Sequence, residues 1–201
     1  MAVAEEKRQI RKQILALRNT ISEEDRNIKS RQILNTLYAL EIYQKSDIIL
    51  TYVEYQSEVK TTPLIERALS ENKQVFVPKV MGTDMDFFQI NSLLELSEGY
   101  KGIKEPKSAE VLFDINVNYD NTSILMLMPG AVFDRAHHRI GYGMGFYDRY
   151  LARLQSAGLS VCKTALCYEC QLLSEIPCDS HDIRPNTIIS EEKVYDKENT
   201  Q

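Results

Sequence analysis

Hydrophobic and polar positions divide this chain into short apolar runs and amphipathic segments. The apolar runs, which are typical of buried strands, are residues 48–53, 74–78, 124–129, 161–167 and 188–189. The segments with apolar residues at helical spacing are 5–18, 22 to about 43, 62–69 and 146–154. Residues 81–90 predict an antiparallel excursion. Because strands and helices alternate, the chain is predicted to form an α/β domain of three layers with a mainly parallel sheet.

The first amphipathic segment, residues 5–18, is strongly basic. Its apolar positions are Ile10, Ile14, Leu15 and Leu17, and its basic positions are Lys7, Arg8, Arg11, Lys12 and Arg18. The spacing of four residues places Lys7 and Arg11 on one face of the predicted helix. A basic helical face is most simply a solvated surface. Residue spacing therefore leaves two interpretations open, a solvated face and an anion-binding face.

A glycine-rich segment lies between an apolar run and a predicted helix. Gly141, Gly143 and Gly145 are one residue apart, Arg139 precedes them and Asp148 follows. Glycine allows positive φ and close approach of a ligand to the backbone, so that free N–H groups can cradle phosphate oxygens. The helix that follows adds its positive N-terminal end, and a carboxylate one turn later is placed to hold a divalent cation. The order predicted is strand, phosphate-binding loop, helix.

The glycine spacing differs from two well-known phosphate motifs. It is not G-x-G-x-x-G, and no Gly-Lys-Ser/Thr follows it as in a P-loop. A flexible turn between strand and helix, with ordinary surface charges, is the alternative that the spacing leaves open.

Two neighbouring motifs resemble one family. Residues 129–135 read Pro-Gly-x-x-Phe-Asp-Arg, and residues 139–148 read Arg-Ile-Gly-Tyr-Gly-x-Gly-Phe-Tyr-Asp. Together they resemble the signature P-G-x-x-F-D-x-x-G-x-R-L-G-x-G-x-G-Y-Y-D of the 5-formyltetrahydrofolate cyclo-ligases, also called methenyltetrahydrofolate synthetases. His137 stands where the family has glycine, in the turn before Arg139. Phe146 stands where tyrosine is usual.

Further segments extend the resemblance from Lys7 to about residue 189. Lys7-x-x-Ile10-Arg11 is similar to the family's K-x-x-[LI]-R, whose basic side chains reach the nucleotide phosphates. Residues 99–106 resemble the family's G-x-x-G-I-x-E-P element. Asp182 matches an acidic residue proposed as a second cation ligand, and Asn186 stands where the family usually has aspartate.

The resemblance implies a Rossmann-like layered sandwich and an ATP-dependent ligase. The implied reaction cyclises 5-formyltetrahydrofolate, with or without a polyglutamate tail, to 5,10-methenyltetrahydrofolate, and releases ADP and phosphate. Lys7 and Arg139 are the implied catalytic residues, and Asp148 and Asp182 are the implied Mg²⁺ ligands. The implied folate contacts are Val53, Glu58, Tyr142, Gly143, Met144, Gly145 and Phe146. The implied ATP contacts are Lys7, Arg8, Gln9, Ile10, Arg11, Arg139, Ile140, Gly141, Tyr142, Gly143, Met144, Gly145, Phe146 and Tyr147.

A catalytically inactive module that binds nucleotide or folate is the alternative function. His137 and Asn186, which depart from the family pattern, favour it, whereas the retained Glu58 and Arg139 favour an active enzyme. His137 and His138 are expected to face solvent, as paired histidines in an exposed loop usually do.

Composition and charge limit the partners. The length suits one domain, residues 1–201, with a polar tail after about residue 195. A net charge of −5 provides no global attraction to nucleic acid or to a membrane, so an anionic ligand requires a local basic cluster. The chain contains no run of about twenty apolar residues, and its start lacks the apolar core of a signal peptide. We therefore expect a cytoplasmic monomer that binds neither nucleic acid nor membrane.

Four cysteines are concentrated near the C-terminal end. They are Cys162, Cys167, Cys170 and Cys178, and Cys167-x-x-Cys170 together with Cys178-x-x-His181 could be drawn as a zinc site. Cys162 and Cys167, however, belong to an apolar run that predicts a strand, and small free cysteines are common in such cores. Core packing is the preferred interpretation.

Overall fold

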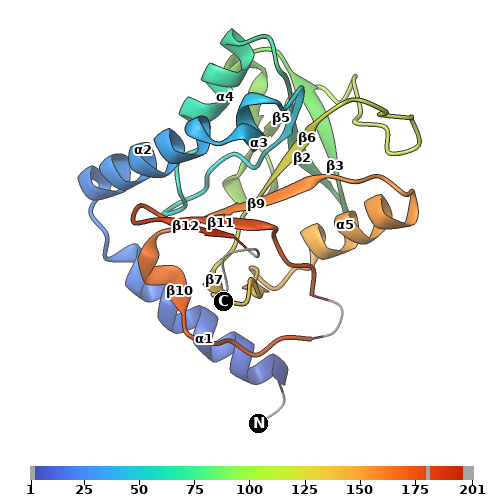
Figure 1. The fold of residues 1–201 in the computed structure, drawn as a ribbon. Helices are drawn as coiled ribbons and strands as arrows, with labels where there is room; N and C mark the ends of the chain where they lie inside the picture. Colours follow the sequence, from blue (N-terminus) through green and yellow to red (C-terminus); the bar gives the residue numbers. More distant parts are fainter. Residues whose placement is uncertain (1–2, 180–181, 197–201) are drawn as a thin grey trace.

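The computed structural model describes residues 3–179 and 182–196 and is built around a seven-stranded sheet (Figure 1). The strand order is β12-β11-β9-β6-β1-β2-β3. Five neighbouring strands are parallel: β11 (Thr187–Ile189), β9 (Cys162–Leu166), β6 (Ile124–Met128), β1 (Ile48–Leu50) and β2 (Gln74–Met81). The two edge strands, β3 (Asp84–Ile90) and β12 (Val194–Asp196), are antiparallel. The predicted mainly parallel sheet and the antiparallel excursion are confirmed.

Helices cover both faces of this sheet. Helices α2 (Glu23–Ala39) and α4 (Thr62–Ser70) bury Ile33, Leu37 and Leu64 against one face, together with the short α3 (Glu41–Gln44). Helix α5 (Phe146–Ser156) buries Tyr150 and Leu154 against the other face. The three-layer prediction is therefore confirmed, and the all-apolar β6 is buried at every position, as expected for a central parallel strand.

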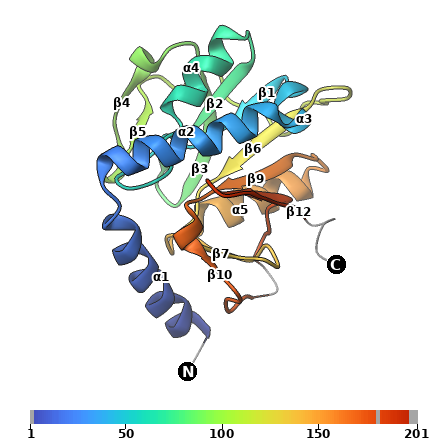
Figure 2. The same ribbon diagram turned by 60° about the vertical axis from the view of Figure 1, so that its left-hand side comes forward.

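A smaller sheet and α1 form the lower part of the molecule (Figures 1 and 2). The sheet has the order β10-β7-β8, with β7 at Val132–Asp134, β8 at Arg139–Ile140 and β10 at Leu172–Leu173. Helix α1 (Val3–Asn19) packs on it through Ile14, which clusters with Val132 and Ile140. Leu17, predicted on the apolar face, is exposed instead.

Two predicted boundaries are corrected. The cap of α2 is confirmed, because the Ser22 side chain accepts a hydrogen bond from the N–H of Asp25. The helix stops at Ala39, however, because Leu40 is extended (ψ 141°) and separates α2 from α3. The run at 48–53 pairs only as far as Leu50, and the chain then leaves the sheet as a loop.

The remaining elements are short. Strands β4 (Leu96–Glu98) and β5 (Lys104–Pro106) pair as a hairpin, and single turns of 3₁₀ helix lie at η1 (Leu93–Glu95), η2 (Tyr100–Gly102) and η3 (Glu169–Gln171). Strand β12 continues to Asp196, and the predicted polar tail beyond it lies outside the described residues. None of the helices within residues 3–179 and 182–196 combines the length and apolar character needed to cross a bilayer.

Candidate active site

A cavity of about 500 Å³ opens where β1, β2 and β6 end. Val53, Val80 and Pro129 line it from these three strand ends, which is where an open parallel sheet usually binds its ligands. Helix α1, the β4–β5 hairpin and the glycine loop complete the walls. The cavity therefore joins segments that are far apart in the sequence.

Nearly all the site residues predicted from the sequence line this cavity. The exceptions lie on α1: Arg8 and Gln9 are exposed and hydrogen-bond to Glu5, and Ile10 packs against the small sheet. The predicted residues in the lining are Lys7, Arg11, Val53, Glu58, Arg139, Ile140, Gly141, Tyr142, Gly143, Met144, Gly145, Phe146, Tyr147, Asp148 and Asp182.

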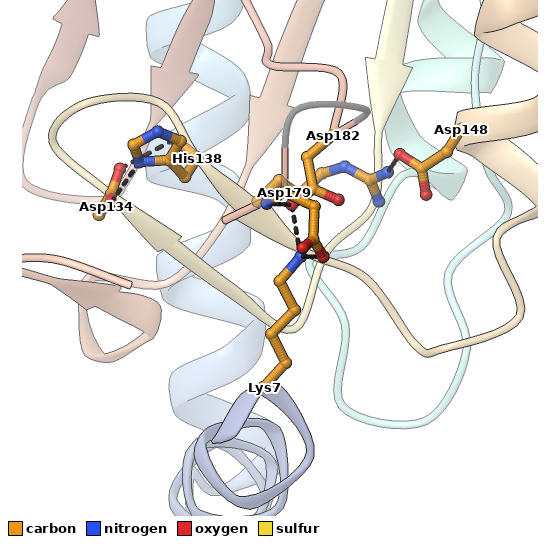
Figure 3. Close-up of polar contacts among 7 residues, drawn as sticks. Lys7, Asp134, His138, Asp148, Asp179 and Asp182 are labelled. Atoms are coloured by element: carbon orange, nitrogen blue, oxygen red, sulfur yellow. Dashed lines mark hydrogen bonds and ion pairs between the residues drawn. The ribbon is translucent and has the colours of Figure 1, made fainter. Parts of the chain in front are cut away.

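One end of the cavity holds cations paired with carboxylates. The Nζ of Lys7 donates to Oδ2 of Asp179 at 2.7 Å and to Oδ2 of Asp182 at 2.5 Å (Figure 3). Burial disfavours the charged Lys7, but these two hydrogen bonds outweigh burial and raise its pKa. The buried Arg139 donates to Oδ1 of Asp148 at 2.6 Å and to the carbonyl of Pro129 at 3.1 Å. Each predicted metal ligand thus already contacts a predicted phosphate-binding cation.

The glycine loop is held against α1. Arg11 donates through Nε to the carbonyl of Gly141 at 2.7 Å. Gly143 (φ +90°) and Gly145 (φ +67°) occupy backbone conformations that favour glycine, and a Cβ at Gly143 would lie 3.2 Å from the Arg11 guanidinium. The loop leads into α5 as predicted, but the strand before it is β8, because the chain forms the β7–β8 hairpin after leaving β6.

The two histidines do not face solvent, so that prediction is wrong. His137 is 1% exposed, and its Nδ1 lies 3.2 Å from the carbonyl oxygen of Pro185. Its φ of +64° is a glycine-like conformation, which explains why this position carries glycine in the family signature. His138 Nδ1 lies 2.8 Å from Oδ2 of the fully buried Asp134 (Figure 3). Contacts of both histidines with neighbouring groups therefore hold the turn between β7 and β8 in place.

The other end of the cavity contains a buried carboxyl group. Glu58 is 8% exposed, and its Oε2 accepts from the N–H of Tyr55 at 2.8 Å. Burial raises the pKa of Glu58, against the opposing effects of hydrogen bonds from Tyr142 and Tyr55 and of the charge of Arg18. Arg18, one of the basic positions whose role the spacing left open, is 3% exposed and lines the cavity. A continuation of the Lys7–Arg11 face by seven residues could have identified it.

Two further polar groups of the lining are Glu105, to which sequence analysis assigned no role, and Tyr147, a predicted ATP contact. Glu105 is buried, and its Oε1 accepts from the N–H of Val80 at 3.2 Å. Tyr147 packs edge-on against Phe87, with ring centroids 6.2 Å apart, and its buried hydroxyl has no hydrogen-bond partner among the described residues. Both groups are polar atoms held in a largely apolar wall.

The four cysteines are free and differ in burial. Cys167 is fully buried in a cluster with Phe133 and Ala165, which confirms core packing for this residue, whereas Cys178 is exposed. His181 lies outside the described residues. Within the described ranges, no group of three or more His, Cys, Asp and Glu side chains is arranged to hold a metal ion.

The sequence model of the 5-formyltetrahydrofolate cyclo-ligase family matches residues 3–191. The chain belongs to this family. A probable 5-formyltetrahydrofolate cyclo-ligase of Schizosaccharomyces pombe is 33% identical over 151 residues, 69% of this chain and 72% of that protein. The 5-formyltetrahydrofolate cyclo-ligase of Mus musculus is 27% identical, over 92% of this chain and 94% of its own.

A solved structure gives the same result for the fold. The 5,10-methenyltetrahydrofolate synthetase of Aquifex aeolicus matches with a TM-score of 0.81 and 30% identity, covering 97% of this chain and 94% of the other. The family resemblance found in the sequence is therefore confirmed.

Proposed function

We propose that this cyclo-ligase family member catalyses the ATP- and Mg²⁺-dependent conversion of 5-formyltetrahydrofolate to 5,10-methenyltetrahydrofolate. One observation carries the proposal: a single cavity has a cationic glycine-loop end, with Lys7 and Arg139, and a buried carboxyl end at Glu58. The first end suits phosphates, and the second suits a ring that offers N–H donors. A cyclo-ligase needs both in one place.

The reaction has a chemical obstacle that ATP removes. The oxygen of the N-formyl group is a poor leaving group. When the γ-phosphoryl group moves to that oxygen and ADP is released, the neighbouring folate nitrogen attacks the formyl carbon. The oxygen then departs as phosphate, which takes up the proton that this nitrogen loses. Such phosphoryl transfer needs mainly positioning and neutralisation of charge.

The phosphate end supplies these requirements. Lys7, Arg11 and Arg139 neutralise the charge, while the glycine loop lets phosphates approach the backbone. Binding replaces the pairs Lys7–Asp182 and Arg139–Asp148 with contacts to the nucleotide. Asp148 and Asp182 are then available for Mg²⁺, which is normally held by one or two carboxylates together with phosphate oxygens, so this donor set fits. When bound, the metal supplies charge neutralisation on the phosphates.

The carboxyl end orients the folate. Glu58 accepts the paired N–H donors of the pterin edge, with Val53 as the apolar wall. Because Glu58 is buried, a ligand that gives its carboxyl oxygens no N–H or O–H donor should bind less tightly than one that does.

The inactive-module alternative loses much of its support. His137 keeps the positive φ that the turn requires. Asn186 does not line the cavity, and its Oδ1 accepts from the N–H of Lys163 at 2.9 Å, which is a structural contact. Neither departure changes the charge of the lining.

The test is product absorbance on mixing the protein, Mg-ATP and 5-formyltetrahydrofolate, because the methenyl product absorbs where the substrate does not. We expect a rise that requires ATP and is lost in Asp148→Ala. If the absorbance does not rise although calorimetry detects nucleotide binding, the result would support the inactive module. That the protein acts as one domain, as a monomer and in the cytoplasm remains a prediction for sedimentation and cell fractionation.

A further inference from the structure

Arg18 lies at the end of α1, between the two loops that form the folate end of the cavity. Its Nε donates to Oγ of Ser57 at 2.9 Å, and its Nη1 donates to the hydroxyl of Tyr142 at 2.8 Å. Ser57 belongs to the loop that carries Glu58, and Tyr142 belongs to the glycine loop. One guanidinium group therefore ties both loops to the helix that carries Lys7.

The direction of the hydrogen bonds is fixed by their chemistry. A guanidinium group only donates, so Tyr142 must accept from Arg18. Burial and the nearby carboxylate of Glu58 raise the pKa of Tyr142, so the hydroxyl keeps its single proton, which is left for the Glu58 carboxylate. The same reasoning makes Ser57 accept from Arg18 and donate to Oδ1 of Asn19, at 2.5 Å. The guanidinium thereby orients both hydroxyl groups.

This arrangement determines what Glu58 has left to offer. A carboxylate has roughly four acceptor positions. Within the described part of the chain, the N–H of Tyr55 occupies one of them, and the Tyr142 hydroxyl, which accepts from Arg18, has its proton left for a second. Both donors favour the ionised carboxylate over the protonated form, which burial would otherwise stabilise. About two acceptor positions remain for a ligand with paired N–H groups.

We propose that Arg18 is a positioning residue for the folate, which acts through Tyr142 to keep Glu58 oriented and ready to accept N–H donors. The inference rests on the proposed function, because it assigns a role at the folate end of the same cavity. Arg18 itself does not touch the reacting atoms in this scheme. Its loss should weaken folate binding selectively and leave the phosphate end intact.

The experiment measures the KM for 5-formyltetrahydrofolate and the KM for Mg-ATP in Arg18→Gln, Tyr142→Phe and the double variant. Lys12→Gln, an exposed basic position on the same helix, is the matched control. We expect Arg18→Gln to raise the folate KM about tenfold, as for a lost hydrogen bond in a charged network. The KM for ATP should stay within about twofold. Arg18→Lys, which keeps the charge without the two-armed fork, should recover only part of the loss.

The double variant separates positioning from simple destabilisation. If Arg18 acts through Tyr142, the double variant should have a folate KM within about twofold of Tyr142→Phe alone. The inference would be overturned if the two substitutions multiplied their effects on the folate KM in the double variant. It would also be overturned if Arg18→Gln raised the KM for folate and the KM for ATP equally, or left the folate KM unchanged. If Arg18→Gln does not fold, Tyr142→Phe provides the same test, because it should also raise the folate KM and change the KM for ATP by less than about twofold.

Wild-type turnover is measured first. Its absence would defeat the proposed function, whereas normal wild-type turnover with an unselective Arg18→Gln would defeat only the inference about Arg18.

Discussion

Removing the hydroxyl of Tyr147 should make the protein more stable and the enzyme worse. The hydroxyl is buried without a hydrogen-bond partner among the described residues, and burial raises its pKa, so it stays protonated. An unpaired buried polar group costs about 1–3 kcal/mol. Tyr147→Phe removes that cost and keeps the edge-on contact with Phe87. At the lower limit of about 1 kcal/mol, the ligand-free Tm should rise by about 2–4 °C for a chain of this length.

The two effects have opposite signs, which makes the test sharp. Thermal unfolding without ligand, followed by circular dichroism, measures the first, and product absorbance measures the second. If a ligand supplies the missing partner, Tyr147→Phe should lose about tenfold in kcat/KM. The control is Tyr43→Phe: its buried hydroxyl donates to Oε2 of Glu71 at 2.8 Å, remote from the cavity lining, so this variant should lower Tm and leave kcat/KM unchanged.

A lower Tm for ligand-free Tyr147→Phe would refute the reasoning, because it would mean that the hydroxyl contributes a favourable contact in the empty protein. A higher Tm with unchanged kcat/KM would refute the second step alone and leave Tyr147 a core residue.

Three further outcomes are expected. Burial raises the pKa of Glu58 above 4.5, so the stability contributed by this group is present below its unfolded pKa and is lost as pH rises through the folded pKa. Glu58→Gln lacks this titration, so the Tm of the variant minus the Tm of the wild type should increase from about pH 4.5 upward in thermal scans. His137→Gly should have a free energy of unfolding about 1 kcal/mol larger than that of His137→Ala in urea titrations, because only glycine adopts the positive φ without strain, and equal stabilities would contradict this account. Asp182→Asn should raise the KM for Mg-ATP at least about tenfold, with partial recovery at higher Mg²⁺ concentration, and an unchanged KM would remove Asp182 from the metal site.

The layers of the fold could be predicted from local pattern. The apolar run at β6 and the capping residue Ser22 can each be recognised from a few neighbouring residues of the sequence. Strand ends could not be predicted as well, because β1 ends at Leu50, where its pairing with β2 and β6 ends, and not where the hydrophobic residues end. Pairing depends on distant segments, which a local window does not contain.

The candidate site divides in the same way. Lys7 and the glycine loop carry recognisable spacing, and the cavity brings them together. Arg18 resembled a surface arginine because its partners, Ser57 and Tyr142, lie 39 and 124 residues away in the sequence. The burial of His137 likewise depends on a distant segment that includes Pro185. Side chains whose roles come from such long-range contacts are the ones that periodicity misses.

The contact of Lys7 with Asp179 and Asp182 spans 172 and 175 residues, so it fastens the first helix to the last part of the chain. Local opening of α1 or of the segment around Asp179 and Asp182 would open the same corner of the cavity, and a ligand bound there would oppose both openings. Mg-ATP should therefore slow amide hydrogen exchange in α1 and in the segment that contains Asp182 together. Helix α1 and the segment that contains Asp179 and Asp182 would then open and close together, with an equilibrium that depends on the nucleotide.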